Sequence, residues 1–154
     1  MDKDMETTDL VLAILHHLLA FSLAGVIGAE FVMLRNEPSP SSIRRLARID
    51  RHYGMIAMAI IAVGIVRVVY GLKGWEFYVY NWMFWAKMAA FMAVGLLSIR
   101  PTMRFIDWNR KAAQPDFQVP GEDLAAVRSA VRMQAIVFIL IPVFAALMAR
   151  GYGI

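Results

Sequence analysis

The chain has 154 residues, of which 60% are hydrophobic, and its formal net charge is +4. This length fits one domain, and the apolar content is too high for a water-soluble protein of this size. The absence of cysteine excludes structural disulfides, thiolate metal ligands and iron–sulfur clusters.

Four apolar segments account for the hydrophobic content. Each has ~17–25 residues, which at about 1.5 Å per residue crosses the ~30 Å hydrocarbon core of a bilayer. The segments do not alternate between polar and apolar residues, so membrane-spanning strands are excluded. The segments are roughly Leu10–Leu34, Tyr53–Tyr70, Trp82–Ile99 and Met133–Ala149. We therefore predict an all-α, integral membrane four-helix bundle, a single transmembrane domain over residues 1–154 with helices at about 9–34, 42–71, 82–110 and 121–150.

The first predicted helix follows an acidic N-terminal tail. Carboxylates near the start of a helix favour its dipole, and Thr7 or Thr8 can cap it. A cleavable signal peptide would be basic at this position and would have a shorter apolar core. We therefore expect the first helix to remain in the mature protein.

The connections between the helices differ in composition. Asn36–Ser42 contains two prolines and several serines, so we expect a turn whose serines cap the next helix. Gly71–Asn81 is rich in aromatic residues, as is typical of a short outer loop anchored at the lipid headgroups. Ala112–Gly121, with two prolines, is predicted to be the second cytoplasmic turn.

Basic residues concentrate near two of these connections. They are Arg35, Arg44, Arg45, Arg48 and Arg51 around the first, and Arg100, Arg104, Arg110, Lys111, Arg128 and Arg132 around the second. The positive-inside rule then puts both connections in the cytoplasm and both termini on the outer, periplasmic side. The positive charge fits an anionic lipid surface better than a nucleic acid, so the predicted partner is the lipid bilayer and no nucleic acid.

Several ionisable residues lie within the apolar segments, where they are costly and by default mark a functional site. His16 and His17 fall roughly 10 Å below the outer edge of the first helix. Lys87 lies at a similar depth on the third helix, and Arg67 lies slightly nearer the outer edge on the second. We expect these four residues to form one polar layer in the outer half of the bundle.

A second polar layer is predicted near the cytoplasmic boundary, and it includes Glu30, Asp50 and His52. Glu30 is fourteen residues after His16, which corresponds to about −40° around a helix, so the two share one face. His17 points about 100° away, and we favour His16 as the inward histidine. Glu30 and His52 are candidates for a proton relay.

Glu30 and His52 can instead have purely structural roles. Glu30 can form an ion pair with Arg51 or Arg100, and His52 can be an interfacial residue beside the arginines.

A histidine inside a membrane can ligate haem iron, hold another metal or relay protons. Zinc or copper would need three or four converging ligands, whereas the three histidines lie at two depths. His52 is about 15 Å deeper than His16, so the two histidines cannot coordinate the same iron. A single axial histidine remains, His16, with the second axial position open or supplied by methionine. Arg67 and Lys87 would pair with the porphyrin carboxylates, or would instead extend toward the outer interface.

Three stretches resemble known membrane proteins: Leu12–Gly25 (LAILHHLLAFSLAG), Arg44–Met55 (RRLARIDRHYGM) and Phe84–Ile99 (FWAKMAAFMAVGLLSI) followed by Arg100. They resemble a bacterial family of small four-helix membrane proteins known only as a domain of unknown function. More distantly, the chain is similar to the HemJ-type protoporphyrinogen oxidases. The shared features are an early Leu-x-x-Leu-His, an Arg-Arg-Leu before the second span and a Trp-x-x-Lys-like element in the third.

The distant resemblance implies that His16 is an axial haem ligand and that Lys87 is the matching lysine of the third helix. It further implies haem b, porphyrinogen oxidation coupled to a membrane electron carrier, and a multi-pass location in the bacterial inner membrane. The doubled histidine and Glu30 have no counterpart in that family. The Trp85–Lys87 spacing is also one residue shorter.

Three functions are therefore considered. The first is a haem- or porphyrin-binding membrane protein with a redox role, using His16, Arg67 and Lys87. The second is a non-enzymatic accessory subunit, for instance a homodimer or the partner of a membrane electron-transfer protein. The third is a small proton-coupled carrier using Glu30, His16 and Lys87, although the chain lacks the inverted repeats of many such carriers.

Overall fold

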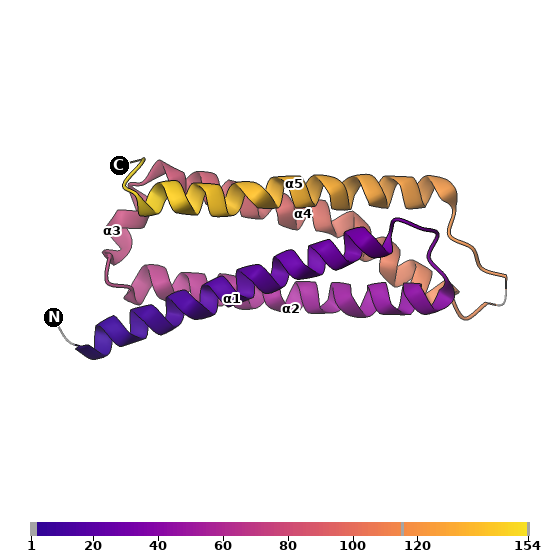
Figure 1. Ribbon diagram of the computed structural model, residues 1–154, viewed down its shortest axis with the longest axis horizontal. Coiled ribbons are helices and arrows are strands. Elements are labelled where there is room, and N and C mark those ends of the chain that lie inside the picture. The colour runs from indigo at the N-terminus through magenta and orange to yellow at the C-terminus, as the bar shows by residue number, and fades with distance from the viewer. Residues whose placement is uncertain (1–2, 115, 154) are drawn as a thin grey trace.

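The computed structural model describes residues 3–114 and 116–153. This part of the chain is helical and contains no strand. Its elements are α1 (Lys3–Met33), α2 (Pro40–Tyr70), α3 (Gly74–Val79), α4 (Trp82–Lys111) and α5 (Gly121–Ala149) (Figure 1). The four long helices are apolar and long enough to cross a membrane. The predicted all-α, membrane-spanning four-helix bundle is confirmed.

The start of α1 differs from the prediction. The helix already begins at Lys3, so the acidic tail forms its first turns. Thr7 and Thr8 donate their hydroxyls to the carbonyls of Lys3 and Asp4, at 2.9 and 2.8 Å, and therefore lie inside the helix. The predicted threonine cap was wrong, because carboxylates near an N-terminus stabilise an earlier start through the helix dipole.

The start of α2 agrees with the prediction in that a serine caps the helix, but the helix already begins at Pro40, inside the predicted Asn36–Ser42 turn. Ser39 precedes the helix and its hydroxyl accepts a hydrogen bond from the backbone N–H of Ser42 at 3.3 Å. Pro40 occupies the first turn, where the missing N–H has no intrahelical partner to lose.

The aromatic connection after α2 contains a short helix, α3, where the sequence suggested only a loop. Buried Asn81 joins this region to α4 and to the C-terminus. Its side-chain oxygen accepts from the N–H of Met83 at 2.9 Å, and its amide donates to the carbonyl of Tyr152 at 3.2 Å. Three connected segments are thereby held by one polar side chain.

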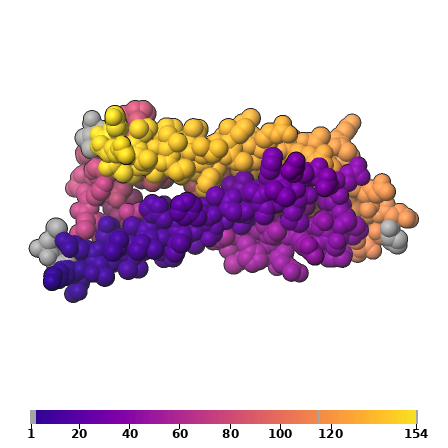
Figure 2. Space-filling model, viewed as in Figure 1, coloured from indigo at the N-terminus to yellow at the C-terminus, as the bar shows by residue number. Residues whose placement is uncertain are grey.

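The bundle has two distinct ends. Both described termini and α3 lie at one end, which we call the terminal end (Figure 1). The α1–α2 and α4–α5 connections lie at the other, which we call the arginine-rich end. The two helices α1 and α5 lie close together at the arginine-rich end and diverge toward the terminal end (Figure 1). The space-filling view shows a hollow between the indigo atoms of α1 and the yellow atoms of α5, near the terminal end (Figure 2).

Packing explains why the bundle closes at one end. The largest buried cluster lies at the arginine-rich end and is centred on Leu46, Phe105, Trp108 and Val127. A middle cluster around Leu23 joins all four long helices. At the terminal end the core is smaller and is built around Tyr78, Met83 and Met148. Large apolar side chains cover much of the outer surface, as expected for helices that face lipid.

Candidate functional site

His16 is the histidine of the pair that faces the neighbouring helix. It is half-buried, and its Cε1 atom would lie 3.6 Å from a Cβ placed on Gly64 of α2. Its Nδ1 is buried and has no hydrogen-bond partner in the described part of the chain. His17 is exposed, and its Nδ1 donates to the carbonyl of Ala13 in its own helix at 2.6 Å. The neighbouring histidines therefore occupy different environments, and only His16 lies against α2.

Two cations from other helices lie near His16. Arg67 of α2 and Lys87 of α4 are both within electrostatic range of the imidazole, and also of one another. The Nε of Arg67 is buried without a hydrogen-bond partner, and the ammonium of Lys87 lies 5.6 Å from the ring centroid of Phe84. Within residues 3–114 and 116–153 neither cation forms a salt bridge. Three of the four residues predicted for the outer layer are thus neighbours in space, and His17 is directed elsewhere.

Tyr78 of α3 lies beside this cluster, and sequence reasoning treated it only as part of an aromatic belt. Burial raises the pKa of its phenol above the usual value, a nearby Arg67 partly offsets this, and Asp9 adds to it. The phenol therefore stays neutral at physiological pH and keeps its O–H as a donor. We refer to His16, Arg67, Lys87 and Tyr78 as the histidine cluster.

A second polar group lies deeper toward the arginine-rich end and takes one or more residues from each long helix. Its members are Glu30, Asp50, Tyr53, Thr102 and Gln134, which we call the acidic cluster. Thr102 donates its hydroxyl to Asp50 at 2.7 Å. Asp50 lies within electrostatic range of Glu30, and the hydroxyl of Tyr53 lies near Gln134.

The acidic cluster is incompletely hydrogen-bonded. Glu30 and Gln134 are only 2% and 1% exposed. One carboxylate oxygen of Glu30 and both amide atoms of Gln134 lack a partner in the described part of the chain. Buried polar groups without partners are costly, and each calls for an explanation such as water, an ion or a functional role.

Glu30 does not form the ion pair with Arg51 or Arg100 that the sequence suggested. Arg51 and Arg100 are exposed, and among the described residues no salt bridge joins either one to Glu30. His52 is exposed as well, and its Nδ1 donates to the carbonyl of Arg48 at 2.7 Å. Of the predicted second layer, Glu30 and Asp50 are thus brought together, and His52 lies outside the cluster.

Sequence reasoning missed Tyr53, Thr102 and Gln134. Gln134 carried a usable signal, because it lies within the apolar run from Met133 to Ile141. An amide in such a run is expected to face the bundle interior. Tyr53 gave no such signal, since tyrosine is common near membrane interfaces. Thr102 gave none either, because it lies beyond the apolar run, between Arg100 and Arg104.

A groove between α2 and α4 connects the acidic cluster to the surface. Its volume is ≈560 Å³, and its lining includes Asp50, Tyr53 and Thr102. Arg51 and Arg110 also line it, together with apolar side chains such as Met103. Solvent or a small molecule at the arginine-rich end therefore has a route to the carboxylate of Asp50.

The two clusters differ in the cofactors that they can hold. Within the described residues no group of three or more His, Cys, Asp or Glu side chains could hold a metal ion. The histidine cluster instead offers one imidazole and two cations without carboxylate partners. That donor set fits haem, which takes an axial histidine and presents two carboxylates that pair with cations. The hollow between α1 and α5 lies at the same end of the bundle (Figure 2).

Comparison with known proteins gives one match. A family model described as "Predicted membrane protein (DUF2214)" matches residues 8–153. No curated protein and no solved structure matches the chain.

Proposed function

This chain belongs to the DUF2214 family of predicted membrane proteins, and we propose that it binds haem at the histidine cluster and takes part in membrane electron transfer. On this proposal His16 would bind the iron of haem b, and Arg67 and Lys87 would hold its carboxylates. The arginine-rich end faces the cytoplasm of a bacterial inner membrane, in accordance with the positive-inside rule.

The environment of His16 is the observation that carries the proposal. A half-buried imidazole whose Nδ1 lacks a partner is an unusual group in an apolar segment. Gly64 leaves room for the ring against α2, and His17 is bonded to its own helix. Binding of a ligand would explain why an imidazole occupies this position, which helix packing alone does not.

Arg67 and Lys87 would hold the carboxylates of the porphyrin. Two cations near a histidine repel each other in a low-dielectric interior, so an anionic partner would relieve that repulsion. Arginine can also bind a carboxylate through two parallel hydrogen bonds. Bound haem supplies one-electron transfer, and its electrons would be exchanged with a porphyrinogen, a quinone-linked carrier, a partner protein or a second copy of the chain.

An absorption spectrum tests the proposal. The full chain is expressed in haem-replete cells, purified in mild detergent and recorded as a reduced-minus-oxidised difference spectrum. We expect a Soret band that is lost in His16→Ala and retained in the matched variant His17→Ala. Absence of the band from the wild-type protein refutes haem binding, and a band that persists in His16→Ala refutes His16 as the ligand.

A proton-coupled role is the second candidate, and the acidic cluster favours it. Glu30 lies buried among groups from all four long helices, and the groove between α2 and α4 reaches neighbouring Asp50. Such carboxylates are typical of proton paths in membrane proteins. In vesicles containing a pH-sensitive dye, proton uptake would fall in Glu30→Gln and persist in Glu37→Gln, which changes an exposed loop residue. Equal uptake by both variants would contradict a role for Glu30.

A further inference from the structure

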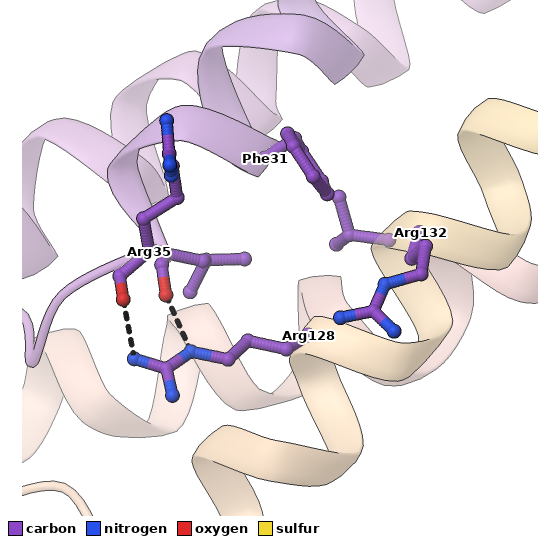
Figure 3. A pocket seen from close by; sticks show the side chains of 6 residues that line it. Phe31, Arg35, Arg128 and Arg132 are labelled. Carbon is purple, nitrogen blue, oxygen red and sulfur yellow. Dashed lines mark hydrogen bonds between the residues drawn. The ribbon is translucent and has the colours of Figure 1, made fainter.

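A second cavity lies at the arginine-rich end, between the end of α1 and the first half of α5. Its volume is ≈270 Å³, and it is lined by Phe31, Leu34, Arg35, Arg128, Val131 and Arg132. Figure 3 shows Phe31 above this space and Arg132 extending toward it from α5. Arg128 passes along the opposite side, and the side chain of Arg35 rises from the end of α1. The lining therefore combines three cations with apolar side chains.

Arg128 has a structural role in this cavity. Its Nε donates to the carbonyl of Leu34, and its Nη2 donates to the carbonyl of Arg35 at 3.1 Å (Figure 3). These carbonyls follow the last turn of α1, which has no basic residue of its own. The guanidinium thereby shields the negative end of the helix from the cavity.

The other two arginines are not neutralised by the described part of the protein. Arg35 and Arg132 are exposed, and neither forms a salt bridge there. By contrast Arg104, at the same end of the bundle, is paired with Asp123 at 2.9 Å. The cavity thus has a net positive charge that an anion can complement.

We propose that this cavity binds the phosphate group of an anionic glycerophospholipid. Guanidinium groups suit phosphate because they offer paired N–H donors, and basic pockets between spanning helices bind anionic headgroups. The cavity lies where α1 and α5 approach the membrane surface, and exposed Phe31 provides an apolar contact for the glycerol or upper acyl chain. A lipid held there contacts α1 and α5 together, at the end where the bundle is closed.

Lipid retention tests this proposal independently of haem. The full chain in mild detergent is incubated with phosphatidylglycerol or phosphatidylcholine, and the bound lipid is counted by native mass spectrometry. The test variant is Arg35→Gln/Arg132→Gln. The matched control is Arg44→Gln/Arg45→Gln, which removes the same charge from exposed residues outside the cavity. Circular dichroism confirms that both variants fold.

We expect the wild-type protein to retain phosphatidylglycerol in preference to phosphatidylcholine. Each arginine removed from the cavity should weaken retention by about 5-fold, the effect of one basic residue near an anionic surface. The control pair should retain the lipid nearly as well as wild type. Equal losses in the two variants would overturn the proposal and leave only diffuse charge attraction. Inorganic phosphate that displaces the lipid at equal concentration would also overturn it, in favour of a site for free phosphate.

Discussion

Replacing Arg128 with methionine tests how α1 is held at the arginine-rich end. Methionine keeps much of the aliphatic length but removes the hydrogen bonds to the carbonyls of Leu34 and Arg35. Hydrogen bonds from a charged donor contribute about 1.5–3 kcal/mol each. The bond to Leu34 is partly buried, whereas water can replace the exposed one to Arg35. We therefore expect Arg128→Met to lower the free energy of unfolding by roughly 2–4 kcal/mol.

Unfolding in mixed micelles measures this change. The protein in mild detergent is titrated with sodium dodecyl sulfate, and unfolding is followed by tryptophan fluorescence, because Trp108 lies in the same core cluster as Leu34. Arg132→Met is the matched control, one turn further along α5 and without a hydrogen bond to α1. It should stay within about 0.5 kcal/mol of wild type.

Arg128→Lys separates the charge from the hydrogen-bonding geometry. Lysine keeps a cation near the end of α1, which contributes about 0.3–1 kcal/mol through the helix dipole, but it lacks the planar fork. Its stability should therefore lie between those of wild type and Arg128→Met. Wild-type stability in Arg128→Met would refute the reasoning entirely, and wild-type stability in Arg128→Lys would show that charge alone is sufficient.

Three further substitutions, at two positions, probe the polar clusters. Gly64→Ala should raise the free energy of unfolding by about 0.5–1 kcal/mol, because a helical glycine is replaced and the new Cβ makes only an ordinary contact with His16. The larger side chain of Gly64→Leu should instead displace the imidazole of His16 and reduce the haem absorbance. An unchanged Soret band in Gly64→Leu would argue against the assigned position of the ligand. Gln134→Leu should stabilise the protein by about 1–2 kcal/mol in the same micelle titration, because it removes two buried amide atoms without partners. Destabilisation would show that the amide is hydrogen-bonded in the membrane, for example through water.

The sequence was sufficient to predict the four spanning helices. Each apolar run must satisfy its own backbone hydrogen bonds inside a bilayer, and only a helix does so within one segment. The same reasoning placed His16, Arg67 and Lys87 at one depth, because depth along a helix follows from residue number. It also predicted that a serine of the first connection caps α2, since capping depends on local residues.

Contacts between helices needed the tertiary structure. Helical periodicity relates residues on one helix, but it does not say how two helices are rotated toward each other. For that reason the partner of Asp50 proved to be Thr102, and Glu30 lies near Asp50 instead of forming an ion pair with Arg51 or Arg100. The tertiary structure likewise decided that Arg128 of α5 meets the carbonyls of Leu34 and Arg35 directly after α1, and that a hollow separates α1 from α5 near the terminal end. The physical reason is that burial and hydrogen bonding between helices depend on side chains far apart in the chain.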